Sequence, residues 1–124
     1  MLENSLYTFN VNIPDSIPFG RIFRINITVL NLKDSTIFLK IVLEEHSGFQ
    51  AGDEYGDGDE VKDVTLNPRG KISLGFKAKV YGVPRNSEVV IIKVYDDKGK
   101  LLQRIERKIY LISQVASIIA VLVG

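Results

Sequence analysis

The chain has 124 residues, enough for one globular domain with a substantial core but not for two. Apolar residues make up 45% and charged residues 25%, as in an ordinary globular protein, and the formal net charge is +1. This near-neutral balance argues against a nucleic-acid-binding protein, which would carry a strongly basic face. One histidine and no cysteine exclude disulfides and leave no zinc site of the usual ligand types, so we expect no cofactor.

Residue usage also bears on where the protein works. The first residues lack the charged start and the apolar core of a signal peptide, so we expect assembly in the cytoplasm or an export signal outside this sequence. Lysine, arginine, glutamate and isoleucine are abundant, whereas methionine occurs once and tryptophan is absent. This usage is compatible with a thermophilic, archaeal source.

Apolar and polar residues alternate with a period of two along most of the chain, and no stretch shows a helical period. In the clearest case, Phe23, Ile25 and Ile27 point to one face and the polar residues between them point to the other. Proline- and glycine-rich segments, such as residues 14–20 and the long loop 46–60, separate the alternating runs. The pattern predicts strands over residues 5–13, 21–31, 36–45, 61–66, 71–81, 88–95 and 100–112.

The last two of these predicted strands carry more specific expectations. Residues 89–92 form a continuous apolar run, which suits a central strand covered on both faces. In the strand 100–112, polar Gln103 and Arg107 interrupt the apolar face. The apolar residues of that face are Leu101, Ile105, Ile109 and Leu111.

About seven short strands at intervals of about 8–12 residues are typical of an all-β antiparallel sandwich. The block at residues 23–33, the segment 64–70 and the lysine-alternating strand after it resemble the immunoglobulin-like domains of bacterial and archaeal surface and adhesion proteins. The resemblance covers roughly residues 5–110, without the Cys-Trp-Cys core of antibody domains. It implies an immunoglobulin-like β-sandwich over residues 1–112, with residues 113–124 as a separate tail.

The tail is uncharged and rich in β-branched residues over residues 115–124. Counted back to Tyr110 the apolar run has 15 residues, which is short of the about 20 that a membrane-spanning helix needs. Valine and isoleucine favour strands, so we expect a strand buried on both faces; a buried terminal helix and a short membrane anchor are the alternatives. The residues expected to form an assembly interface are Val115, Ile118, Ile119, Val121, Leu122 and Val123.

Two functions fit such a tail. In the first, the chain is the structural subunit of a filament or of a virion or cell-surface fibre, and it polymerises head to tail by donating the tail to a neighbouring copy. This layout resembles that of pilins and other strand-complementing filament subunits, and an archaeal virus fibre is the specific hypothesis. In the second, the tail folds back as an eighth strand of a monomeric or dimeric binding module. Such a module would recognise a host cell-surface component through loops such as residues 48–60.

Acidic residues gather in the loop 53–60, where Asp53, Asp57, Asp59 and Glu60 are candidate calcium ligands. Laid on the EF-hand register from Asp53, the third position is Tyr55 and the twelfth is a valine, so that motif fails. The alternative is a solvated acidic loop that keeps an edge of the sandwich soluble.

The remaining candidate sites are weaker. His46 stands without a paired nucleophile and is expected to be a surface residue, and no nucleophile elbow or phosphate-binding loop is present, so we expect no enzyme. Asn26 begins an Asn-Ile-Thr glycosylation sequon, and the alternation places it on the outer face of its strand.

Overall fold

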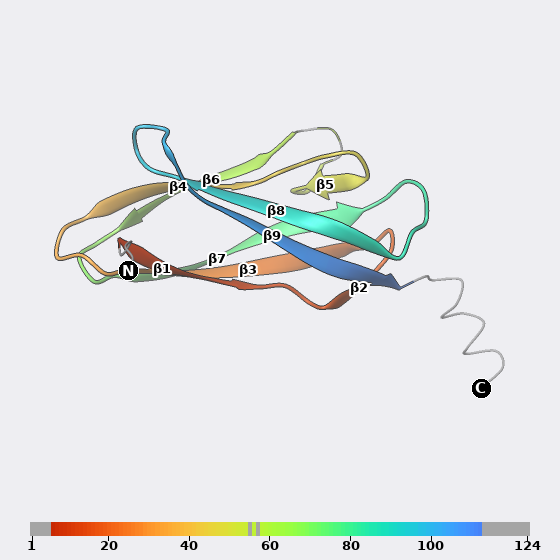
Figure 1. Cartoon of the computed structure of the whole chain (residues 1–124), viewed down its shortest axis with the longest axis horizontal. Coiled ribbons are helices and arrows are strands. Elements are labelled where there is room, and N and C mark those ends of the chain that lie inside the picture. Colours follow the sequence, from red (N-terminus) through yellow and green to blue (C-terminus); the bar gives the residue numbers. More distant parts are fainter. Residues whose placement is uncertain (1–5, 55, 57, 113–124) are drawn as a thin grey trace.

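A computed structural model describes residues 6–54, 56 and 58–112 of the chain (Figure 1). In this part of the chain nine strands form and no α-helix does, so no helix long and apolar enough to cross a membrane occurs there. The strands are β1 (Tyr7–Asn12), β2 (Ser16–Pro18), β3 (Ile22–Asn31), β4 (Ile37–Leu43), β5 (Phe49–Ala51), β6 (Glu60–Leu66), β7 (Lys71–Val80), β8 (Ser87–Tyr95) and β9 (Leu101–Ile112).

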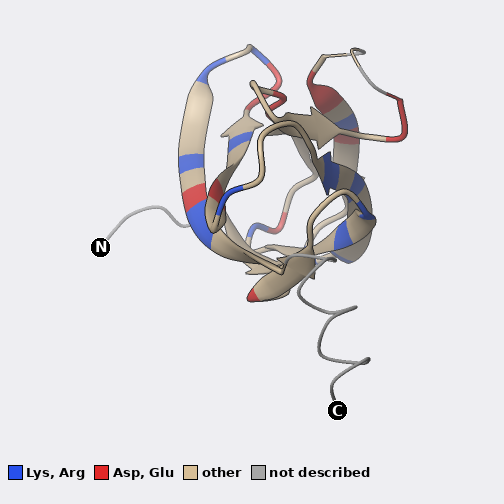
Figure 2. Ribbon diagram, turned by 90° about the vertical axis from the view of Figure 1, so that its right-hand side faces the viewer, with Lys and Arg blue, Asp and Glu red and all other residues tan. Residues whose placement is uncertain are grey.

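The strands form two sheets that face each other across a common core. One sheet has the order β1-β3-β7-β5 and the other the order β2-β9-β8-β4-β6. Every pairing is antiparallel except that of β2 with β9, which is parallel. The end-on view of Figure 2 shows the two layers around the core. The predicted all-β sandwich is therefore confirmed.

The predicted strand positions are confirmed within two residues at each end, but two short strands were missed. β2 lies in the segment predicted as a turn, and β5 lies in the segment predicted as a loop. Each has three residues, too few for a period of two to be visible in the sequence. β2 also ends in Pro18, a residue that sheets accept only at an edge.

Alternating side chains of both sheets fill the core, as the period of two predicts. Ile25, Ile27 and Val29 of β3 are fully buried, and they face the inner rows of the opposite sheet. β8 lies in the middle of its sheet, as its apolar run predicts, but only the residues Val90, Ile92 and Val94 are buried. The expectation that both faces of β8 are covered is wrong, because only one layer packs against this sheet.

A β-bulge changes which residues of β9 face the core. Val94 of β8 pairs with Gln103, and the next residue pairs with Leu101, so Leu102 has no cross-strand partner. Leu102 packs against the core, whereas Leu101 is 45% exposed. The prediction that Leu101 lies on the inner face is therefore wrong, since a period of two does not reveal a bulge.

Candidate assembly site

One edge of β9 is largely without a partner strand among the residues that the structure describes. On one side β9 pairs with β8 along its length, and on the other it pairs with β2 only at Tyr110–Ile112. Residues 101–109 therefore present backbone N–H and C=O groups that no described strand pairs, which is a template for an added strand.

The chain leaves this edge open because it changes sheets between β1 and β2. β1 pairs with β3 in the four-stranded sheet, whereas β2 pairs with β9 in the five-stranded sheet. Pro14 lies at the change, where it has no N–H group to offer a ladder. β1 therefore meets the start of β9 across the seam between the sheets without pairing with it.

A groove of about 370 Å³ lies in this seam. Its lining residues are Leu6, Tyr7, Phe9, Leu102 and Gln103, which come from β1, from β9 and from the residue before β1. Leu6 is 38% exposed, and Phe9 and Leu102 are half-buried. The groove is thus mainly apolar and open to a ligand with apolar side chains.

A hydrogen bond between side chains spans the seam at the groove. The Tyr7 hydroxyl donates to Gln103 Oε1 over 2.9 Å, and the Tyr7 ring meets the Phe9 ring edge to face at 6.2 Å. Burial raises the pKa of the Tyr7 phenol, because the charged phenolate is poorly solvated there. In the sequence Gln103 interrupts the apolar face of its strand. In the structure it accepts the hydrogen bond that joins β9 to β1 in the opposite sheet.

Beyond the groove the free edge becomes charged. The alternation places Arg107 in the same row as Ile105 and Ile109, the row that faces the core. Ile109 is buried, but Arg107 is exposed. A residue in the core-facing row can be exposed only where the seam between the two sheets is open. Glu106 and Lys108 are exposed on the other face of the strand.

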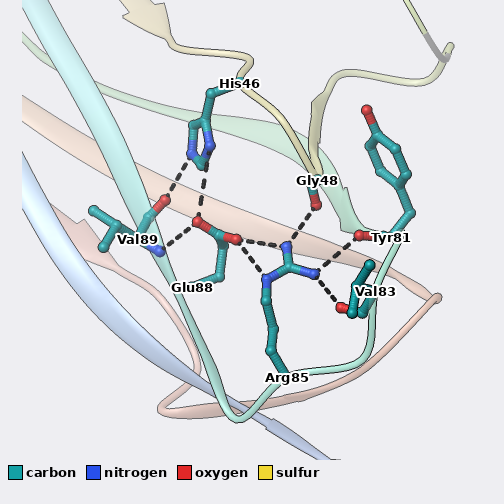
Figure 3. Close-up of polar contacts among 7 residues, drawn as sticks. All are labelled: His46, Gly48, Tyr81, Val83, Arg85, Glu88 and Val89. Atoms are coloured by element: carbon teal, nitrogen blue, oxygen red, sulfur yellow. Dashed lines mark hydrogen bonds and ion pairs between the residues drawn. The ribbon is translucent and has the colours of Figure 1, made fainter.

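A second polar constellation holds the turn between β7 and β8 (Figure 3). Arg85 donates hydrogen bonds to the backbone carbonyls of Tyr81, Val83 and Gly48, at 3.1, 2.8 and 3.0 Å. Its Nε donates to Glu88 Oε1 over 2.9 Å, and the same carboxylate contacts the guanidinium a second time. The guanidinium thereby ties this turn to the β4–β5 loop.

His46 belongs to the same cluster and is not the surface residue that the sequence predicts. Its ring stacks on Phe49 at 5.2 Å, and Nε2 lies 3.0 Å from the carbonyl oxygen of Val89. Nδ1 lies 3.8 Å from Glu88 Oε2, which also accepts the Val89 N–H. Since these polar groups already bind one another, the role of this cluster is structural: it holds the turn between β7 and β8 in place.

Two carboxylates of the acidic loop make contacts within the chain. Asp53 pairs with Lys77 at 3.4 Å, and Asp59 Oδ1 accepts the N–H of Glu45 over 2.8 Å. No group of three or more potential metal ligands occurs in the described part of the chain. Glu60 is half-buried at the start of β6, and Asp57 lies outside the described residues. An ion site at this loop stays a prediction.

The other candidate residues fall into two groups. Asn26 is exposed on the outer face of β3, as predicted, and Thr28 two residues later lies 3.4 Å from the Ser73 hydroxyl; glycosylation there stays a prediction. The predicted interface residues Val115, Ile118, Ile119, Val121, Leu122 and Val123 lie outside the described residues. The division into a domain over residues 1–112 and a tail over residues 113–124 likewise stays a prediction.

Comparison with known proteins supports the fold. No protein-family model matches the chain, and no curated protein does. A structure of a Salmonella alpha-2-macroglobulin mutant is 17% identical with a TM-score of 0.67; the match covers 86% of this chain and 7% of that one. WR4, a C. elegans MSP family member, is 15% identical with a TM-score of 0.51, over 88% of this chain and 100% of its own. These likenesses show an immunoglobulin-like all-β domain.

Proposed function

We propose that this chain is a structural subunit of a filament or of a virion or cell-surface fibre. It polymerises head to tail by placing residues 113–124 in the β1–β9 groove of a neighbouring copy. The observation that carries the proposal is that an unpaired strand edge and an apolar groove occur together along β9. Strand addition uses both features, because the edge supplies main-chain hydrogen bonds and the groove accepts alternate side chains.

The free edge and the tail match in length. Residues 101–109 of β9 extend over roughly 26 Å, at about 3.3 Å for each residue. Residues 115–124 would extend over roughly 30 Å as a strand. A segment without charge or proline can pair along such an edge without burying an unpaired charge.

The start of the tail favours donation to another copy over insertion into its own groove. β2 already occupies the edge of β9 at the point where the tail begins, since Ile17 pairs with Leu111 and the Phe19 N–H donates to the Ile112 carbonyl over 3.0 Å. To reach its own groove, the tail would have to reverse direction and pass over β2. A neighbouring copy requires no reversal.

The partner in this proposal is a second copy of the chain. The proposed location is the surface of a virion or cell, after assembly in the cytoplasm or export. The resemblance to bacterial and archaeal surface domains and the residue usage of the chain support this location and a thermophilic, archaeal source.

Light scattering on the full chain and on a chain ending at residue 114 tests the proposal. We expect large polymers from the full chain and a monomer from the shorter one, with circular dichroism showing the same strand content in both. Replacing Ile119 by lysine keeps the length of the tail and should also prevent assembly, because it puts a charge into the buried strand. A full chain that stays monomeric at every concentration would refute the proposal.

A specific observation favours a second candidate, the monomeric or dimeric binding module. An inward-facing charge on a free edge, such as Arg107, is a common means of preventing strand addition. In a binding module the tail would complete its own sandwich, and residues 48–60 would contact a host cell-surface component. The shorter chain should then unfold, whereas the proposed subunit should stay folded without its tail.

A further inference from the structure

We infer that the donated segment runs parallel to β9, entering the groove beside Leu6 and Leu102 and ending next to β2 of the receiving copy. The inference rests on the proposed function and adds the direction of the donated strand and the end of the sandwich at which it enters.

The positions of the groove and of the tail support this direction. The groove is lined by residues at the start of β9, and the tail begins where β9 ends. Leu102 and Ile112 lie roughly 33 Å apart along an extended strand, so the two features are at opposite ends of the sandwich. Figure 1 shows β9 extending along the sandwich to its end beside β2.

Stacking of copies end to end follows from this separation. The tail of one copy then leaves its β9 directly into the groove end of the next copy and continues in the same direction. The same contact repeats at every copy and generates an open chain. An antiparallel strand would have to enter over β2, and the chain would have to turn back on itself.

β2 provides a second, independent argument, because it already pairs in parallel with this edge. Tyr110 donates its N–H to the carbonyl of Asp15 over 2.9 Å, and Phe19 donates to Ile112 over 3.0 Å. A donated strand along residues 101–109 in the same direction would lie in line with β2. The two would form one continuous parallel edge with the ladder geometry that β9 already adopts.

The distribution of charge along the edge gives a third argument. In the core-facing row the groove end is lined mainly by apolar side chains, whereas nearer to β2 this row contains the exposed Arg107, with Glu106 and Lys108 on either side of it. An apolar strand that enters at the groove end buries its first side chains without displacing water from a charge. The alkyl stems of arginine and lysine can then cover its later residues while their charged ends stay in water.

Cross-linking of paired cysteines tests the direction of the donated strand. Because the chain has no native cysteine, every cross-link joins introduced cysteines. Arg104 and Lys108 are exposed on the same face of β9, and Ser117 lies near the start of the tail. Two full-length double variants are compared, Arg104→Cys with Ser117→Cys, and Lys108→Cys with Ser117→Cys. In a parallel arrangement Ser117 lies nearer to position 104, and in an antiparallel arrangement it lies nearer to position 108.

The assembled variants are treated with a short bismaleimide and run on a denaturing gel. We expect a ladder of covalent multimers from the 104/117 variant and none from the 108/117 variant, while each single-cysteine variant stops at the dimer. A ladder from the 108/117 variant alone, or from both equally, would overturn the inferred direction. Polymers that neither variant can link would show that the donated strand lies elsewhere. A wild-type chain that does not polymerise refutes the proposed function itself.

If these variants fail to assemble while the wild-type chain does, Leu101→Cys and Tyr110→Cys replace the acceptor positions. Both side chains are exposed and lie near the two ends of the free edge. Linking at position 101 and not at position 110 is expected, and the reverse result would overturn the inference.

Discussion

Asn31 joins the two sheets at one end of the sandwich and offers a quantitative test of what holds it together. Its side chain is fully buried. Nδ2 donates to the carbonyls of Ser35, Leu66 and Asn67 at 2.8, 3.2 and 2.9 Å, and Oδ1 accepts the Lys33 N–H over 2.8 Å. One amide therefore fixes the turn after β3 against the end of β6 in the other sheet.

Replacing Asn31 by alanine removes both amide donors and the acceptor. At about 1 kcal/mol for each hydrogen bond, plus the cost of buried carbonyls left without a donor, the free energy of unfolding should fall by about 3–5 kcal/mol. Asn31→Leu should be as harmful although it fills the space, because it supplies no donor. Asn31→Asp should also be harmful, because it turns a buried carboxylate toward carbonyl oxygens.

Urea unfolding at one fixed protein concentration measures these differences. Asn10→Ala is the matched control: Asn10 is exposed on the outer face of β1, so its loss should change stability by no more than about 0.5 kcal/mol. An Asn31→Leu chain as stable as the wild type would show that only side-chain volume matters at this position. That result would refute the account based on hydrogen bonds.

Three further predictions concern groups that the structure places in defined environments. Tyr7→Phe should cost about 1 kcal/mol through loss of the bond to Gln103. Because burial raises the folded-state pKa of Tyr7 above 10.0, wild-type stability should fall as the pH rises through that range, and urea midpoints should show a smaller fall in Tyr7→Phe. Arg85→Lys should cost about 1–3 kcal/mol by urea unfolding, because a lysine cannot reach three carbonyls and a carboxylate together. Hydrogen bonds from the backbone, that of Lys100 foremost, lower the pKa of the Asp96 carboxyl below 3.8. The ionised carboxylate therefore stabilises the fold fully above that pH, and this stabilisation is lost as the pH falls through the lowered pKa. Asp96→Ala should make the free energy of unfolding fall less steeply with decreasing pH on the acid side.

The sequence predicts the long strands well because each is half-buried in a two-layer sandwich. Burial on one face imposes a period of two, and that period is visible wherever a strand is long enough, as in β3 and β7. β5 fails on both counts, since its three residues are all buried and a glycine lies on each side. It is held in place by packing and by distant contacts, such as the pairing of Phe49 with Val80.

The candidate site was harder to predict, because a period of two does not show which sheet a strand joins. The tail pointed to an open edge somewhere, but the location of that edge depends on the change of sheet between β1 and β2. One signal was present in the sequence: Pro14 and Pro18 lie on either side of a three-residue segment whose one apolar residue is Ile17, and prolines in a strand are typical of a sheet edge. The bond from Tyr7 to Gln103 joins residues that are 96 positions apart, and no local pattern reveals it.

The free edge of β9 contains features of both candidate functions, and their order along the strand reconciles them. Near β2 the charged residues 106–108 discourage pairing with an arbitrary strand, as they would in a monomeric module. Near the start of β9 the apolar groove favours an uncharged strand. A strand that can pair along the whole edge must therefore enter at the groove and be long and apolar enough to continue past the charges. Residues 115–124 are uncharged and long enough to meet these requirements, so in the proposed assembly the charges that prevent random association would also select the tail of another copy.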